Sequence, residues 1–322
     1  MAVYEVGKLD DNVIEAINLT KKYGSFTALS DLNLNLSGSK CVGFLGPNGA
    51  GKTTTLKIFT DLIRPSSGQA IINGINVQQN KKKALSNCSA LIETPEIYPS
   101  MTVREALSLV AELRGVPRSE RSSQIEEVVA EVKMTDWLDK SVGKFSKGMK
   151  QRVNIASTLI GNPSIILLDE PTSGLDPRGM AEVRDIVKSL KKKDRLIFMS
   201  SHLLNEVADV CDEVAMIDHG KLLAYGPLEE ITDKFSTVDD SAEAQFSRAI
   251  DESINSQISR IDGIVSVEKL DSRTVKIKYT GGLKSQEYIL ATLAGMQIGL
   301  VGFKSSSTRL EDTYLNLIKE TL

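Results

Sequence analysis

The stretch Gly46-Pro47-Asn48-Gly49-Ala50-Gly51-Lys52-Thr53-Thr54 decides the fold of this chain. It follows a short apolar run at residues 41–45 and precedes residues with helical spacing. The pattern is G-x-x-x-x-G-K-[ST], in which glycines let the backbone curl so that successive N–H groups point at phosphate oxygens. A strand before the loop and a helix after it are the context that a phosphate-binding loop requires. We therefore expect a nucleoside triphosphate to bind here.

Two side chains of this loop are expected to act directly on the triphosphate. Lys52 should reach the β- and γ-phosphates, and the Thr53 hydroxyl can ligate Mg²⁺. The N-terminus of the following helix adds a partial positive charge. The predicted nucleotide contacts of the loop are Gly46, Pro47, Asn48, Gly49, Ala50, Gly51, Lys52, Thr53 and Thr54.

A second chemical element is a run of apolar residues that ends in two acids. Residues 165–168, Ile-Ile-Leu-Leu, have the character of a strand buried in a parallel sheet, and Asp169 and Glu170 follow. Such a strand places both carboxylates at the carboxyl edge of the sheet, where α/β proteins bind ligands. Asp169 is expected to hold Mg²⁺ through its water shell, and Glu170 to act as general base toward the attacking water. Taken alone, the same pattern is as typical of a strand that ends in solvated carboxylates.

Length and composition fit a globular protein whose partners do not include nucleic acid. The 322 residues allow a large domain plus a smaller one, and 41% apolar and 25% charged residues are ordinary proportions. A net charge of −3 lacks the basic footprint of a nucleic-acid binder. The three cysteines, at 41, 88 and 211, have no metal-site spacing and are typical of reduced thiols. The sequence shows no signal peptide and no apolar stretch of about 18 residues, so we expect another chain to supply any membrane span.

The order of the expected elements predicts an α/β fold. Alternating patterns at residues 13–19 and 32–36 indicate an N-terminal antiparallel part, and strand–helix alternation between residues 164 and 217 indicates a mainly parallel sheet. Helical patterns between these parts, one of them with a capping box at Thr102–Glu105, indicate a helical insertion over about 95–162. We expect the resulting nucleotide-binding domain to cover residues 1–235.

A small second domain is expected after a polar linker. Residues 236–244 are the predicted linker, and residues 245–322 are the predicted α+β accessory or regulatory domain with ferredoxin-like packing. The expected order is a helix over Gln245–Arg260, strands over Ile264–Leu270 and Thr274–Tyr279, a helix over Leu283–Ala294, a strand over Ile298–Lys304 and a last helix over Leu310–Leu322.

The residues Phe145-Ser146-Lys147-Gly148-Met149-Lys150-Gln151-Arg152 narrow the interpretation. They resemble LSGGQ-x-QR, the signature of the ATP-binding cassette (ABC) ATPases, and the resemblance extends over about Val13 to Pro227. It implies a P-loop ABC cassette in which Ser146, Lys147, Gly148 and Met149 face the γ-phosphate of a nucleotide held by another subunit. Lys147 stands where the family usually has glycine, and Met149 where it usually has glutamine. Lys147 either adds positive charge near the phosphate or lies in solvent.

The resemblance also assigns residues outside these motifs. Tyr23 matches the aromatic residue that stacks on adenine, although a tyrosine in a turn is also typical of an ordinary surface residue. Asp176 ends the sequence Ser-Gly-Leu-Asp, which matches the loop that reaches the other subunit's site. His202 matches the switch histidine, which contacts the γ-phosphate. Together with the motifs above, these matches make Glu170, His202 and Lys52 the expected catalytic residues.

Glu93 occupies, by spacing, the place of a glutamine that marks the family. A carboxylate can still coordinate Mg²⁺, so Thr53, Glu93 and Asp169 are the expected metal residues. Glu93 together with the Ser-Lys-Gly-Met sequence resembles exporter subunits of the bacitracin- and daunorubicin-resistance type, as does the tail at residues 309–315.

These observations predict the ATPase subunit of an ABC exporter. The expected cofactors are ATP and Mg²⁺, and the expected partners are a second ATPase subunit, identical or related, and a separate transmembrane permease subunit. We expect a peripheral protein at the cytoplasmic face of the cell membrane. A soluble ABC ATPase of DNA repair or translation is the alternative outside transport, but the chain has neither sustained heptads nor a second phosphate loop. An importer subunit is the alternative within transport.

Overall fold

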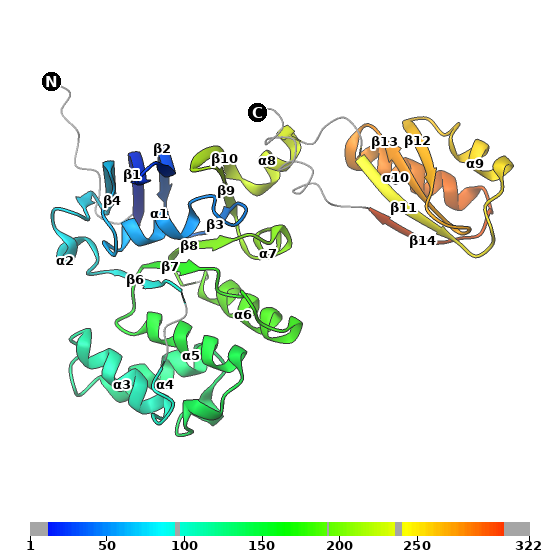
Figure 1. Cartoon of the computed structure of the whole chain (residues 1–322). Helices are drawn as coiled ribbons and strands as arrows, with labels where there is room; N and C mark the ends of the chain where they lie inside the picture. Colours follow the sequence, from blue (N-terminus) through cyan, green and yellow to red (C-terminus); the bar gives the residue numbers. More distant parts are fainter. Residues whose placement is uncertain (1–11, 94–96, 192, 236–239, 306–322) are drawn as a thin grey trace. The chain divides into compact units, whose positions relative to one another are not determined.

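The computed structural model of the protein describes residues 12–93, 97–191, 193–235 and 240–305. The chain divides into two units, Met1–Leu228 and Glu229–Leu322, each with its own hydrophobic core (Figure 1). Among the described residues, no helix combines the length and the apolar character needed to cross a membrane. The predicted domain bounds, 1–235 and 245–322, remain predictions.

A mainly parallel sheet of six strands carries the nucleotide motifs of the first unit. Its order is β10-β9-β3-β8-β7-β6, in which β9 to β6 run parallel and β10 pairs antiparallel with β9. The central strands β3, β8 and β7 are buried along their whole length, as expected for a parallel sheet covered on both faces. The strands are β3 (Cys41–Leu45), β6 (Cys88–Leu91), β7 (Ile165–Asp169), β8 (Leu196–Ser201), β9 (Glu213–Asp218) and β10 (Lys221–Pro227).

An antiparallel sheet with the order β2-β1-β4-β5 forms the predicted N-terminal part. Figure 1 shows helix α1 (Lys52–Phe59) between this sheet and the parallel one. Leu56, Ile58 and Phe59 of α1 are fully buried and belong to one core together with residues of both sheets. The strands are β1 (Val13–Tyr23), β2 (Phe26–Ser37), β4 (Ser67–Ile72) and β5 (Ile75–Asn76).

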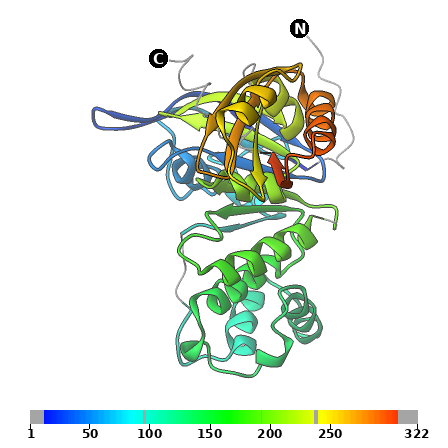
Figure 2. The same ribbon diagram turned by 90° about the vertical axis from the view of Figure 1, so that its right-hand side faces the viewer.

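A helical group follows β6 along the chain and confirms the predicted insertion; Figure 2 shows it in cyan and green below the strands. Thr102 and Glu105 form the predicted capping box at the start of α3. The group contains α3 (Val103–Leu113), α4 (Arg121–Glu131), two short 3₁₀ turns (Thr135–Trp137 and Val142–Lys144) and α5 (Lys147–Leu159). The remaining helices of this unit are α2 (Lys81–Ala84), α6 (Pro177–Leu190) and α7 (Leu204–Val210).

The second unit has the predicted ferredoxin-like topology. After α8 (Leu228–Phe235), its elements alternate in the order β-α-β-β-α-β, and the antiparallel sheet has the order β12-β13-β11-β14. The buried side chains of these strands and helices form a separate core around Phe246, Ile277 and Tyr279. The elements are β11 (Asp240–Phe246), α9 (Glu252–Ile258), β12 (Ile264–Lys269), β13 (Thr274–Tyr279), α10 (Gly282–Gly295) and β14 (Leu300–Ser305).

The single helix predicted over residues 245–260 is wrong. Residues 240–246 form strand β11, and only Glu252–Ile258 is helical. Alanine, glutamate and glutamine favour helices in isolation, but packing overrides this preference here. Buried residues alternate with exposed ones along β11, namely Ala242, Ala244 and Phe246 with Glu243 and Gln245. Part of the predicted linker therefore belongs to a strand, and the predicted last helix, Leu310–Leu322, lies outside the described residues.

A fragment of residues 229–322 should fold by itself, because its core is formed within the unit. We expect one cooperative thermal transition by circular dichroism. Ile277→Asp places a charge in the centre of this core and should abolish the transition, whereas Val265→Asp, at a position 56% exposed, should preserve it. A gradual melt of the unmodified fragment would show that the unit depends on the rest of the chain.

Candidate active site

Three neighbouring strands bring the predicted motifs to one edge of the parallel sheet. Because β3, β8 and β7 lie side by side and run parallel, the residues that follow them leave the sheet at the same edge. Gly46 follows β3, Glu170 follows β7 and His202 follows β8. The Gly46 N–H donates to the carbonyl of Ser201 over 3.3 Å, which joins the phosphate loop to the end of β8.

The phosphate loop contains positions that no side chain fits. A Cβ atom at Gly46 would lie 2.3 Å from the carbonyl oxygen of Ile217. Gly51, the N-cap of α1, has φ of 107°, and a Cβ atom there would lie 2.6 Å from the carbonyl oxygen of Ala28. Gly49 also has a positive φ, but it faces open space. The loop is therefore packed tightly from behind and open in front, as a phosphate cradle requires.

The ammonium group of Lys52 lies within this loop, and only 4% of the residue's surface is exposed. The ammonium donates to the carbonyl oxygens of Gly46, at 2.8 Å, and Pro47, at 3.0 Å. It also lies 3.4 Å from Oε1 of Glu170. Burial lowers the pKa of Lys52, and the carboxylates of Glu170 and Asp169 oppose this shift by favouring the charged form. The arrangement holds a cation next to the place where phosphate oxygens would lie.

Asp169 is a buried carboxylate whose oxygens are satisfied by two hydroxyl groups. The Thr53 hydroxyl donates toward Oδ1 at 3.0 Å and Oδ2 at 2.9 Å, and the Ser200 hydroxyl donates to Oδ1 at 2.7 Å. Mg²⁺ prefers oxygen ligands and is usually bound by one or two carboxylates together with substrate phosphates and water. The hydroxyl of Thr53 and the carboxylate of Asp169 therefore fit such an ion.

The Glu170 carboxylate lies between the ammonium group of Lys52 and the imidazole ring of His202. Its Oε1 faces the Lys52 ammonium, and its Oε2 lies 3.1 Å from Nδ1 of His202. Its backbone N–H donates to the Ser200 hydroxyl at 2.9 Å, and its φ of 44° is unusual for a residue with a long side chain. Strained conformations of this kind persist where the surrounding contacts enforce them, and they concentrate at functional sites.

A cavity of about 230 Å³ opens above the loop. Eight predicted residues line it, namely Tyr23, Asn48, Gly49, Gly51, Lys52, Thr53, Thr54 and Glu170. Phe26, which is 60% exposed and paired with Tyr23 across the β1–β2 turn, lines it as well and was missed by the sequence analysis. The turn Gly24-Ser25 was the available signal, because a two-residue turn places its flanking residues opposite each other. Ser200 was also missed, since its contact with Asp169 depends on the register of β7 and β8.

Comparison with known proteins gives the same result as the geometry. Residues 29–173 match the family model described as ABC transporter. The bacitracin transport ATP-binding protein BcrA of Bacillus licheniformis is 42% identical over 220 residues, 68% of this chain and 71% of that protein. The uncharacterized ABC transporter ATP-binding protein YhcH of Bacillus subtilis (strain 168) is 32% identical over 311 residues, 96% of this chain and 97% of that protein. The solved ATP-binding subunit of an ABC transporter superposes with a TM-score of 0.62 at 29% identity, over 69% of this chain and 93% of that one. This chain belongs to the ABC transporter family.

As an ATP-binding protein of the ABC transporter family, the chain is an ATPase. The family, the cassette fold and the binding of ATP, all predicted from the sequence, are confirmed. The roles of the individual residues remain predictions, which the geometry supports to different degrees.

The ABC signature residues lie at the N-terminus of α5, where they first serve the helix itself. Ser146 is the N-cap, and its hydroxyl accepts a hydrogen bond from the Met149 N–H at 3.2 Å. Lys147 reaches toward Gly174, where a Cβ atom would lie 2.3 Å from its Nζ. Gly148 packs against Gly179 of α6, so the N-termini of α5 and α6 are neighbours. Within the part of the chain that the structure describes, these signature residues do not line the cavity above the phosphate loop.

Asp176 also has a local task, because its Oδ1 accepts a hydrogen bond from the Gly179 N–H at 2.8 Å and caps α6. The contacts of Glu93 differ from those of Thr53 and Asp169, which bond each other. Its side chain is 68% exposed, and its carboxylate is bonded to Lys57. The metal role of Glu93 and the nucleotide role of Asp176 therefore remain predictions.

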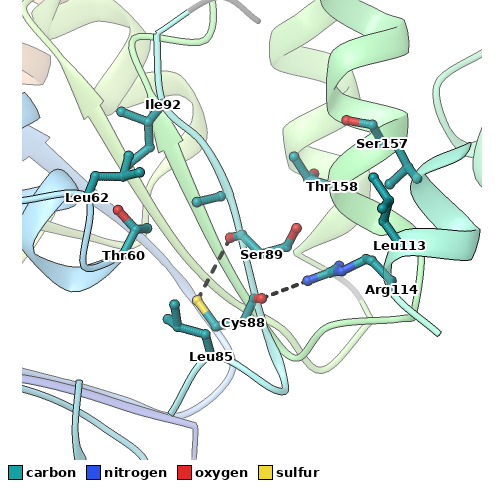
Figure 3. A pocket seen from close by; sticks show the side chains of 12 residues that line it. Thr60, Leu62, Leu85, Cys88, Ser89, Ile92, Leu113, Arg114, Ser157 and Thr158 are labelled. Atoms are coloured by element: carbon teal, nitrogen blue, oxygen red, sulfur yellow. Dashed lines mark hydrogen bonds between the residues drawn. The ribbon is translucent and has the colours of Figure 1, made fainter. Parts of the chain in front are cut away.

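A groove lies where the edge strand β6 faces the helical group (Figure 3). A cavity of about 530 Å³ opens there, and a second of about 200 Å³ adjoins it through the shared residues Val110 and Ser157. Figure 3 shows the Arg114 side chain in this groove, and its guanidinium donates to the carbonyl oxygens of Cys88, at 2.8 Å, and Ile160, at 2.6 Å. Leu62 and Leu113 line the groove although they are 61% and 79% exposed.

The cap formed by Asp176 can be separated from any nucleotide role by substitution. Asp176→Ala should lower the free energy of unfolding by about 1 kcal/mol, because the Gly179 N–H loses its acceptor. Asp176→Asn keeps an acceptor oxygen and should unfold like the unmodified protein in urea. Equal stability of the alanine and asparagine variants would contradict the capping role.

Proposed function

We propose that the chain is the ATP-hydrolysing subunit of an ABC exporter and that it drives a separate membrane-spanning permease. The observation that carries the hydrolytic part is the Glu170 carboxylate held between Lys52 and His202, next to Asp169 and Thr53. A carboxylate in this position can accept a proton from a water molecule that lies between it and the γ-phosphate.

In the proposed mechanism, Glu170 removes a proton from the attacking water as its oxygen forms a bond to the γ-phosphorus. The bond between the γ-phosphorus and the bridging oxygen of ADP breaks, and phosphate leaves. Lys52 neutralises negative charge on the phosphate oxygens, and His202 orients Glu170 through its Nδ1 contact and reaches the γ-phosphate with its other ring nitrogen. The loop N–H groups and the N-terminus of α1 bind the remaining phosphate charge.

Thr53 and Asp169 would hold Mg²⁺ in this mechanism. Their oxygens already lie within hydrogen-bond distance of each other at the base of the loop. The ion, when bound, would neutralise charge on the β- and γ-phosphates. Tyr23 and Phe26, which are exposed at the rim of the cavity, provide aromatic surface against which an adenine ring can stack.

The proposed active form is a pair of ATP-binding subunits. In the described part of the chain, Ser146 to Met149 do not line the cavity above their own phosphate loop, which supports the proposal that they act on a nucleotide held by a second subunit, identical or related. Capping by Ser146 and Asp176 keeps the two helix N-termini in place for that contact.

The groove between β6 and the helical group is the proposed contact with the permease. Leu62 and Leu113 are exposed and line this groove together with other apolar residues, and exposed apolar surface around a groove is a common feature of protein–protein contacts. Ile97 and Tyr98 line the adjoining cavity and extend this surface. The chain would accordingly lie at the cytoplasmic face of the membrane as a peripheral subunit.

Export is proposed as the direction because one of the relatives, the bacitracin transport ATP-binding protein, aligns with 68% of this chain. The relatives named above are transporter ATP-binding proteins, which supports transport over a role in DNA repair or translation. A nucleic-acid partner is not part of the proposal, since the net charge is −3.

The Glu170→Gln variant tests the proposed base. It should bind ATP with unchanged affinity and lower kcat by at least about 100-fold, because the amide cannot accept the proton. Single-turnover hydrolysis and nucleotide binding measure the two effects separately. Glu15→Gln, which changes a half-buried glutamate bonded to Asn35, serves as the control and should hydrolyse ATP normally. A Glu170→Gln variant that retains most of its kcat would exclude Glu170 as the base.

Leu113→Asp tests the groove. Because the leucine is 79% exposed, the change should leave folding and the ATPase activity of the isolated chain intact. It should reduce copurification of a multi-spanning membrane protein from detergent extracts by at least about tenfold, since a charge would replace an apolar contact. Ile17→Asp, at an exposed position on β1, is the matched control. Equal recovery of the membrane protein with both variants would exclude this groove as the contact.

A further inference from the structure

Glu206 is a buried acid for which the mechanism above has no use. It lies on α7, directly after the segment that carries His202, and only 2% of its surface is exposed. Its Oε2 accepts a hydrogen bond from the Ser201 hydroxyl at 2.8 Å. Its Oε1 is buried and has no hydrogen-bond partner among the described residues.

Such a carboxylate does not improve the stability of the fold. Burying a charged group is costly unless its oxygens are fully paired, and a leucine of similar size would avoid this cost. The rest of this contact region is apolar, with Val207 of α7 packed near Gly43 of β3. Unsatisfied buried polar atoms are rare in native proteins, and each of them requires an explanation.

The hydrogen bond from Ser201 points to that explanation. The Ser201 hydroxyl also accepts a hydrogen bond from the Leu203 N–H at 2.9 Å, and the Ser201 carbonyl accepts one from the Gly46 N–H. Ser201 and Leu203 are the two neighbours of His202 in the chain. The Glu206 carboxylate thus fixes both sides of His202 through one hydroxyl group, and it fixes them against the phosphate loop.

We propose that Glu206 is a positioning residue for hydrolysis, which holds the Ser201–Leu203 turn so that His202 meets Glu170. The proposal rests on the role of His202 proposed above. Without the carboxylate, the Ser201 hydroxyl has a different acceptor available, the carbonyl oxygen of Leu203 at 3.4 Å. A rotation toward that acceptor changes the turn without leaving the hydroxyl unpaired, so geometry is lost while stability is kept.

Glu206→Leu and Glu206→Gln test the proposal in the full-length protein. The leucine variant should lower kcat for ATP by about 10- to 100-fold, because a displacement of about 1 Å in a positioning group has effects of that size. Its KM should not rise, and its melting temperature should not fall, relative to the unmodified protein. The glutamine variant retains an acceptor for Ser201 and should recover most of the lost rate. Asp209→Ala removes another acid of the same helix, one paired with Lys188, and should leave kcat unchanged.

A double-mutant cycle with His202→Ala separates this proposal from the function on which it rests. Glu206→Leu should have little further effect on kcat once His202 is absent, since both changes remove the same contribution. If His202→Ala hydrolyses ATP normally, the proposed role of His202 fails. If His202→Ala is impaired and Glu206→Leu is not, only the inference about Glu206 fails.

Two further outcomes would overturn the inference. One is a Glu206→Leu variant that loses melting temperature and kcat together, with glutamine restoring neither of them. The other is additive effects of the two substitutions in the cycle. Should the leucine variant not fold, Ser201→Ala removes the same hydrogen bond from the other side and enters the cycle in its place. Its kcat should fall, and normal hydrolysis by Ser201→Ala would overturn the inference equally.

Discussion

The site depends on the hydrogen bonds between the buried ammonium group of Lys52 and the backbone carbonyl groups of the phosphate loop. A cation removed from water is stable only where acceptors surround it, and the acceptors here are the carbonyl groups of Gly46 and Pro47. These carbonyls turn toward the ammonium because the loop packs against the sheet at Gly46, where a side chain would collide with Ile217. The path of the loop, the position of the charge and the placement of Glu170 opposite it are therefore a single electrostatic arrangement.

Strand order turns this local arrangement into an active site. Because β8 lies between β3 and β7, the residues at its end contact both neighbours. Ser201 accepts a hydrogen bond from the phosphate loop, and Ser200 bonds both the carboxylate of Asp169 and the backbone N–H of Glu170. The end of β8 thus connects the groups that bind phosphate with the groups proposed to hydrolyse it. His202 is the next residue after β8. A movement of His202 would therefore affect both the phosphate-binding groups and the groups proposed to hydrolyse the phosphate.

The sequence allowed prediction wherever the cause of a structure is local. The phosphate loop with the helix after it and the capping box at Thr102 appear as expected because a few neighbouring residues determine them. Residues 240–246 were misjudged, because polar composition predicted a linker up to residue 244 and a helix from residue 245, whereas pairing with β13 and β14 makes the segment a strand. Ser200 and Glu206 could not be recognised as parts of the site, because their contacts arise from register and burial rather than from spacing in the chain.

Several of the buried polar groups of the first unit lie at the edge of the parallel sheet that carries the site. Lys52 and Glu206 are found there beside Asp169 of β7 and beside Ser200 and Ser201 at the end of β8. The helix that begins with Lys52 continues into Leu56, Ile58 and Phe59, which join the central core, so the phosphate loop is fixed to the most stable part of the unit. The turn after β8 is held instead by polar contacts, namely the hydrogen bonds of Ser201 to Gly46 and Glu206 and the contact of His202 with Glu170. A response to the state of the nucleotide is therefore expected at this turn and not in the loop, because the loop cannot move without disturbing the core.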